Sequence, residues 1–167
     1  MGKEGKRNLT FVILIVLGIL LLAFMDIIVL EKVYHPLAQI YNINWDTLNA
    51  VIFGIDLGIL WWHVAFFTLA FSLFVLLGVA AKSWRLAVSG ISLFILGWED
   101  IFYYILQLRW LPSELPWLNN APMGLSRYLT GTANVTCLGV LISAFIGVII
   151  AGLVLFKYNP LRLFKKG

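Results

Sequence analysis

Long apolar runs separated by short polar segments dominate this chain. Four runs approach or exceed the roughly 20 apolar residues that a helix needs to cross the bilayer hydrocarbon, and they cover residues 9–30, about 51–81, 86–108 and 131–156. Because lipid pairs with no backbone N–H or C=O group, we expect all four runs to be helices. Short connections favour antiparallel neighbours. The pattern therefore predicts an all-α, polytopic membrane protein, an antiparallel four-helix bundle forming a single domain over residues 1–167.

The composition agrees with this interpretation. Hydrophobic residues make up 62% of the chain and charged residues only 12%, whereas soluble domains have about 25% charged residues. The first run is longer than the apolar core of a secretory signal, which has about 7–15 residues, so we interpret it as an uncleaved span. The chain's one cysteine, Cys137, excludes an internal disulfide and a CxxC redox pair.

The basic residues predict an orientation. A four-span topology places the N-terminal tail, the second connection and the C-terminal tail on one side of the membrane. Of the 12 lysines and arginines, only Lys32, Arg109 and Arg127 fall on the other side. By the positive-inside rule both termini are cytoplasmic, in a multi-pass protein of the plasma membrane. The net charge of +4 then reflects topology and attraction to anionic lipid rather than nucleic-acid binding.

Ionisable residues inside the runs are the main functional signal. The four runs hold no lysine or arginine, yet they contain Asp26, Asp56, His63, Glu99 and Asp100. Such groups are costly in hydrocarbon and mark functional sites by default. The predicted topology places all five in the outer half of the bilayer, although Asp26 lies so close to the end of its run that an interfacial role is favoured.

Helical phase selects among these residues. Asp56 and His63 are seven positions apart, which places them on one face of a continuous helix. A polar stripe along the third run consists of Ser89, Ser92, Glu99 and Tyr103. We therefore expect Glu99 to face the bundle interior, while the phase leaves the direction of Asp100 open.

Three physical accounts of the acidic residues remain open. In the first, Asp56, His63 and Glu99 bind a divalent metal, with zinc, iron or manganese suited to a mixed imidazole and carboxylate set. In the second, a carboxyl group exchanges protons with His63 as its partner. In the third, the acids line a wet vestibule or contact Arg109 or Arg127. Asn134 is expected to make packing or hydrogen-bond contacts in the first turn of the fourth helix.

The leading functional hypothesis is a small membrane enzyme acting on a lipid or isoprenoid-like substrate. Its candidate catalytic residues are Glu99 as metal ligand or general acid, Asp100 as an orienting group and Tyr103 as a hydrogen-bond donor. The alternatives are a cation- or proton-coupled transporter or channel subunit and a non-catalytic subunit of a larger membrane complex. Self-association into a homo-oligomer is a further alternative. Aromatic residues in the outer connections fit an aromatic belt, or an entrance for an amphiphile.

Overall fold

Helices make up most of the structure, a computed structural model that describes residues 3–34, 36, 40, 49–52, 55–119 and 122–156; of residues 3, 4, 30, 34, 49–52, 55–63 and 122 it describes the backbone alone. Within this part of the chain three helices are long and apolar enough to cross a membrane, Gly5–Val33, Trp84–Leu106 and Cys137–Leu155. Multi-pass membrane character is therefore confirmed. His35 and the basic C-terminal tail lie outside the described residues.

The first span is a single long helical segment. Helix α1 covers Lys3–Ile27 and continues as the π-helix η1, Ile28–Tyr34. Its buried side chains follow steps of three or four residues, as expected for one helix face, and they are Phe11, Ile15, Ile19 and Leu22. The opposite face is also apolar but exposed, with Leu17 56% and Phe24 53% accessible. A helix that is apolar all round suits a lipid environment.

The second predicted span is shorter than expected. Helix α3 covers Trp61–Ala80, whereas the hydropathy pattern predicted a helix from about Val51. The residues before it form an antiparallel hairpin of β1, Asn49–Ile52, and β2, Ile55–Leu60. Hydropathy does not distinguish a strand from a helix, and this stretch is rich in β-branched residues and glycine, which lower helix propensity. The boundary at Val51 was therefore wrong.

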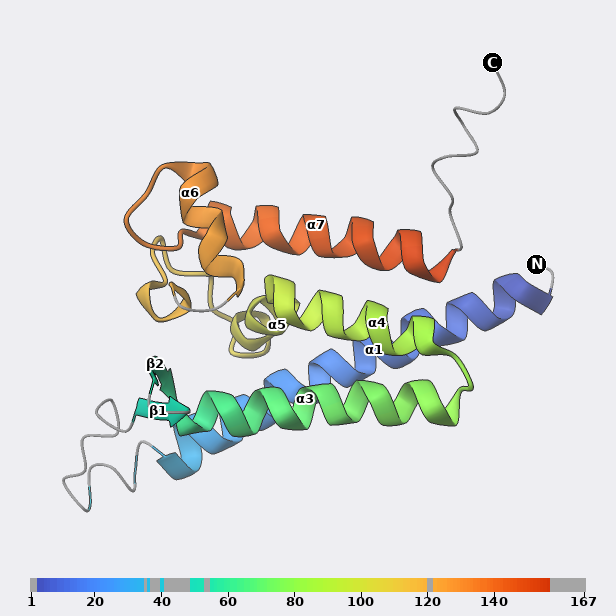
Figure 1. Cartoon of the computed structure of the whole chain (residues 1–167), viewed down its shortest axis with the longest axis horizontal. Helices are drawn as coiled ribbons and strands as arrows, with labels where there is room; N and C mark the ends of the chain where they lie inside the picture. Colours follow the sequence, from blue (N-terminus) through green and yellow to red (C-terminus); the bar gives the residue numbers. More distant parts are fainter. Residues whose placement is uncertain are drawn as a thin grey trace.

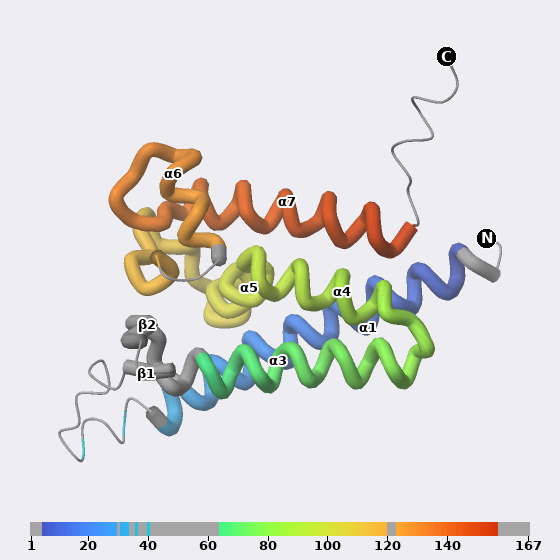
Figure 2. The backbone as a smooth tube through the Cα atoms, viewed as in Figure 1, coloured from blue at the N-terminus to red at the C-terminus, as the bar shows by residue number. Residues whose placement is uncertain are grey.

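A tight turn joins α3 to the next helix, α4, Trp84–Leu93. The Lys82 N–H donates to the Val79 carbonyl at 3.0 Å and the Ser83 N–H to the Gly78 carbonyl at 2.8 Å. This is the Schellman pattern that ends a helix, with Lys82 in the left-handed conformation at φ 49°. Figure 2 shows the backbone bending sharply here, so that α3 and α4 lie side by side.

The third span does not continue as a straight helix. After α4 come the π-helix η3, Phe94–Trp98, and helix α5, Glu99–Leu106. In Figure 1, α4 runs across the view whereas α5 is seen almost along its axis, so the chain changes direction between them. The last span is α7, Cys137–Leu155, where Thr136 caps the first turn by accepting a 3.1 Å hydrogen bond from the Gly139 N–H.

The two ends of the molecule differ. The start of α1, the α3–α4 turn and the end of α7 lie at one end, called here the turn end (Figure 1). The hairpin and the segment between α5 and α7 lie at the other, the cap end. The number of membrane crossings and the side on which each terminus lies remain predictions.

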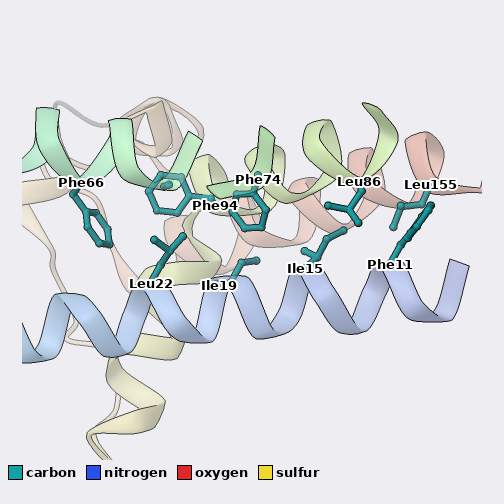
Figure 3. Close-up of a cluster of buried hydrophobic side chains, with 10 residues drawn as sticks. Phe11, Ile15, Ile19, Leu22, Phe66, Phe74, Leu86, Phe94 and Leu155 are labelled. Atoms are coloured by element: carbon teal, nitrogen blue, oxygen red, sulfur yellow. The ribbon is translucent and has the colours of Figure 1, made fainter. Parts of the chain in front are cut away.

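One apolar core joins α1, α3, α4, η3 and α7. Phe74 of α3 has no exposed surface and lies between α1 and α4 (Figure 3). A Cβ atom at Gly90 would lie 2.2 Å from the Phe74 ring, and one at Gly18 would lie 3.0 Å from it. Glycine at these two positions therefore lets three helices close around one aromatic ring, since a Cβ atom would overlap the ring at Gly90 and crowd it at Gly18.

The connection between α5 and α7 folds into a compact cap. It contains the 3-10 helices η4, Pro116–Leu118, and η5, Pro122–Leu125, and the short helix α6, Ser126–Thr130. Its buried residues form a second apolar cluster with α5 and α7, and these include Leu115, Leu118, Met123 and Val135. The described residues of the cap therefore belong to the fold and pack against the start of α5.

Candidate functional site

A break in the third span creates the candidate site. Leu96 (φ −94°, ψ 18°) and Gly97 (φ 95°, ψ 11°) depart from helical geometry, and only glycine adopts the second conformation without strain. The next helix begins at Glu99, so Glu99 and Asp100 lie in the first turn of α5. The first N–H groups of a helix have no intrahelical partners, and its dipole favours negative charge at this end.

Glu99 is buried in the bundle, as the polar stripe predicted. Its side chain is only 7% exposed, and its Oε1 atom has no hydrogen-bond partner among the described residues. The adjacent Trp98 is anchored by a 2.9 Å hydrogen bond from its indole N–H to the Ala144 carbonyl of α7. A buried carboxyl oxygen without a partner is energetically costly, so this position calls for a further binding partner.

Other carboxyl groups surround Glu99. The charges of Asp100 and of Asp26 from α1 are near enough to interact with that of Glu99, and α1 packs directly against α5. Both aspartates are half-buried. The sequence favoured an interfacial role for Asp26, whereas in the structure its charge interacts with that of the buried Glu99. The sequence predicted a similar depth for Asp26 and Glu99, but it did not predict that the first and third spans pack against each other.

A polar path leads from this cluster toward the cap end. Tyr103, one turn after Glu99, donates a 3.2 Å hydrogen bond to Glu31 Oε1 of η1, and Glu31 is exposed. Gln107, which follows directly after α5, lies one turn beyond Tyr103, and its side chain interacts with that tyrosine. Glu31 and Gln107 were not predicted from the sequence, because both lie at or beyond the edge of an apolar run.

The helix break also changes the predicted polar stripe. The stripe assumed one continuous helix, but Ser89 and Ser92 lie before the break and Glu99 and Tyr103 after it. Ser89 donates instead to the Ala151 carbonyl of α7 at 3.2 Å, and Ser92 to the Val88 carbonyl of its own helix at 2.8 Å. Ser89 therefore links α4 to α7, whereas Ser92 bonds within its own helix, and the site is limited to α1, η1 and α5.

The predicted metal ligands come from three separate elements. Asp56 lies in β2 and His63 in the first turn of α3, so the shared helical face predicted for them is wrong; their side chains lie outside the described part of the structure. Among the residues that the structure describes, no group of three His, Cys, Asp or Glu side chains is placed to hold a metal ion. The set Asp56, His63 and Glu99 stays a prediction.

Asn134 belongs to a different polar network, in the cap. Asn134 was predicted in the first turn of the fourth helix, but it precedes α7. Its side chain accepts a hydrogen bond from Asn119 Nδ2 at 2.9 Å and donates one to Glu114 Oε2 at 2.8 Å. Asn119 Oδ1 also accepts from the Val135 N–H at 2.8 Å. These bonds confirm the expected hydrogen-bonding role. They hold the cap against the start of α7.

Arginine contacts to the acids were one of the accounts left open. Arg127 of α6 instead donates to the Tyr128 hydroxyl at 3.2 Å and lies 5.0 Å from the centre of that ring. Arg109, just after α5, is exposed.

No family model, curated protein or solved structure matches the chain.

Proposed function

We propose that the protein crosses the plasma membrane four times, with α3 as the short second crossing and both termini in the cytoplasm. The apolar helix Val64–Ala80 is near the lower length limit of about 17 residues for a spanning helix. Figure 1 shows the α3–α4 turn at the same end as the start of α1. The turn and the first residues of α4 carry Lys82 and Arg85, and the start of α1 carries Lys6 and Arg7. Clustered basic residues at one end follow the positive-inside rule.

The proposed role is proton-coupled transport, with this chain as a transporter subunit and Glu99 as its proton-binding group. The observation that carries the proposal is a buried carboxyl oxygen that has no partner in the described part of the chain and lies in the first turn after a break in a spanning helix. Discontinuous helices at membrane depth are typical of ion and substrate sites in transporters. Intramembrane carboxyl groups are typical of proton relays.

Electrostatics favours a neutralised Glu99. Three nearby carboxylates in a medium of low dielectric repel one another strongly, and removing an ionised carboxylate from water without a partner costs far more than a hydrogen bond returns. A proton or a cation bound at Glu99 relieves both costs. Proton binding needs one accessible carboxyl group, whereas the divalent-metal alternative additionally needs the side chains of Asp56 and His63 to converge on Glu99.

The polar path gives the site a direction. The charges of Asp26 and Asp100 interact with that of Glu99, and Tyr103, one turn after Glu99, donates a hydrogen bond to the exposed Glu31 at the cap end. Toward the turn end, the described core consists of residues such as Ile15, Ile19 and Phe74 (Figure 3). Protons therefore exchange with the cap side, and complete transfer across the membrane requires another subunit or a second copy of this chain.

An enzyme acting on a lipid or isoprenoid-like substrate is the second candidate, with Glu99 as general acid. The observation in its favour is the apolar surface beside the site: Leu108 is 94% exposed and Trp110 95% exposed, immediately after α5. Such residues suit contact with an amphiphile at the membrane interface. In this alternative Asp100 orients Glu99, and the Tyr103 hydroxyl donates a hydrogen bond to the substrate.

Carbodiimide labelling tests the shared premise. A membrane-soluble carbodiimide reacts with a protonated carboxyl group in an apolar environment, and mass spectrometry locates the adduct. We expect labelling at Glu99 in proteoliposomes and its loss in Glu99→Gln, whereas Glu114→Gln, which changes an exposed cap carboxylate, leaves it unchanged. Absence of any adduct at Glu99 would contradict the proton site.

Flux measurements separate the two candidates. Acid pulses on proteoliposomes that contain a pH-sensitive dye report proton movement by the purified protein or its complex. Under the transport proposal, Glu99→Gln abolishes the dye response and Glu114→Gln does not. A Glu99 adduct together with flux that is unaffected by Glu99→Gln would refute transport and leave the acid-catalyst alternative.

A further inference from the structure

Trp98 lies between the helix break and the buried acid. It follows Gly97, which has a left-handed backbone, and it precedes Glu99, the first residue of α5. Its indole N–H donates a 2.9 Å hydrogen bond to the Ala144 carbonyl of α7. The indole ring also packs against both apolar clusters of the molecule. Trp98 is therefore held by a polar contact to α7 as well as by apolar packing.

One face of α7 supports the whole break. Val140, Ala144 and Gly147 are spaced by four and three residues, so they lie on the same side of this helix, and all three are buried. A Cβ atom at Gly97 would lie 3.3 Å from Val140 Cγ1, and one at Gly147 would lie 3.2 Å from Leu96 Cβ. The π-helix η3 therefore lies directly on this face, and the Ala144 carbonyl falls between the two close contacts along α7.

The hydrogen bond adds direction to this packing. Apolar contacts are non-directional, so they fix the distance between two helices better than the rotation of either one. A hydrogen bond instead weakens steeply when the N–H group turns away from its acceptor. Ala144 is only 2% exposed, so water does not readily replace the indole as partner of its carbonyl. Rotation of Trp98 away from α7 therefore carries the cost of unpaired polar groups in apolar surroundings.

The backbone transmits the direction of Trp98 to Glu99. Trp98 has helical angles, φ −68° and ψ −29°, and continues directly into α5, so the two side chains leave the helix axis about 100° apart. The preceding residue, Gly97, is conformationally permissive, so α4 does not by itself fix the rotation of α5. With Trp98 held on α7, Glu99 takes its buried position on the part of α5 that packs near α1.

We propose that Trp98 is a positioning residue for Glu99, because the bond from its indole N–H to Ala144 fixes the rotation of α5 after the break. The role rests on the proposed function, since it affects proton binding only if Glu99 is the proton-binding group. Trp98 itself does not exchange the proton. Phe102, one turn further on α5, supports the indole with its ring centre 5.7 Å from that of Trp98.

The reactivity of a cysteine at position 99 tests the positioning role without involving a proton. The full-length chain carries Glu99→Cys and Cys137→Ser, and mass spectrometry follows its modification by a water-soluble methanethiosulfonate in proteoliposomes. Position 98 carries tryptophan, 5-fluorotryptophan, which keeps the N–H, or benzothienylalanine, in which sulfur replaces the N–H in a ring of similar size. We expect benzothienylalanine to raise the reaction rate about fivefold, the factor expected for one hydrogen bond, and 5-fluorotryptophan to leave it unchanged.

Carbodiimide labelling of Glu99 itself is the second readout. With benzothienylalanine at position 98, we expect the ratio of labelling by a membrane-soluble reagent to labelling by a water-soluble one to fall about fivefold. Benzothienylalanine in place of Trp110, which lies just beyond α5 and is 95% exposed, is the matched control. It should change neither the carbodiimide ratio nor the thiol reactivity.

The outcomes separate this role from the proposed function. Equal thiol reactivity with tryptophan and benzothienylalanine at position 98 would overturn the positioning role, whether or not Glu99 reacts with carbodiimide. An increase that 5-fluorotryptophan also produces would overturn it as well, because that analogue retains the N–H. An increase confined to benzothienylalanine, together with no carbodiimide adduct at Glu99 in the native protein, would support the positioning role and contradict the proton site.

Discussion

Replacing Gly97 by alanine tests whether the helix break is built into the fold. Gly97 adopts φ 95°, a conformation that L-residues rarely take. A Cβ atom there would lie 3.2 Å from Met123 Sδ and 3.3 Å from Val140 Cγ1. We therefore expect Gly97→Ala to destabilise the native state and to disturb the position of Glu99, two residues later.

The magnitude follows from these two contributions. A left-handed conformation costs an L-residue about 1–2 kcal/mol, and the contacts require small shifts of Met123, which is flexible, and of Val140. Together they predict a loss of about 2 kcal/mol in the free energy of unfolding. Alanine also favours a continuous helix over glycine by about 1 kcal/mol, so part of the population can straighten and carry Glu99 out of its buried position.

Two other glycines serve as controls. Gly131 has φ 67°, and a Cβ atom there would meet no other atom within 4 Å, whereas Gly152 has neither a positive φ nor a close neighbour. Gly131→Ala should therefore cost about 1 kcal/mol from backbone strain alone. Gly152→Ala, inside helix α7, should stabilise by about 0.5–1 kcal/mol.

Chemical unfolding in detergent, followed by tryptophan fluorescence, measures all three variants. Carbodiimide labelling of Glu99 in the same samples reports whether the carboxyl group has moved. If Gly97→Ala is as stable as Gly152→Ala and labels Glu99 normally, the break does not depend on glycine and the reasoning is refuted.

Three further predictions concern the scaffold. Phe74→Ala removes a fully buried ring held between Gly18 and Gly90 and should cost about 3–5 kcal/mol, whereas Leu76→Ala, at a position 66% exposed, should cost far less in the same unfolding assay. Thr136→Ala removes the α7 cap and should cost about 1 kcal/mol; Ser83→Ala, where no side-chain cap bond exists, should leave stability nearly unchanged. Asn134→Ala removes hydrogen bonds to the side chains of Asn119 and Glu114 and should lower the free energy of unfolding by about 1–3 kcal/mol. We also expect faster proteolysis of the cap in this variant. Equal proteolysis of variant and native protein would contradict a structural role for the network.

Hydropathy predicted where the spanning segments lie because transfer into hydrocarbon depends on side-chain composition over about 20 residues. It could not place the start of α3, since the same apolar residues satisfy a strand and a helix. The segment before Trp61 therefore forms a hairpin, and the predicted pairing of Asp56 and His63 on one helical face is lost. The roles proposed for these two residues stay predictions.

The candidate site shows the same division. The burial of Glu99 was predicted from the spacing of polar residues on its helix, although that spacing assumed a straight helix and the structure has a break at Gly97. The participation of Asp26 and of Glu31 depends on how α1 and η1 pack against α5. Contacts between separate spans are not encoded in local spacing, so a single sequence cannot reveal them.

The amino-acid sequence alone determined that this is a membrane protein with apolar helical spans and acidic residues in costly surroundings, because these properties follow from the composition of each segment. Tertiary packing decided which acids meet, where the third span bends, how the α5–α7 connection folds into a cap, and which carbonyl of α7 the Trp98 indole bonds to. These features arise from contacts between residues far apart in the chain, and such contacts exist only once the helices have packed.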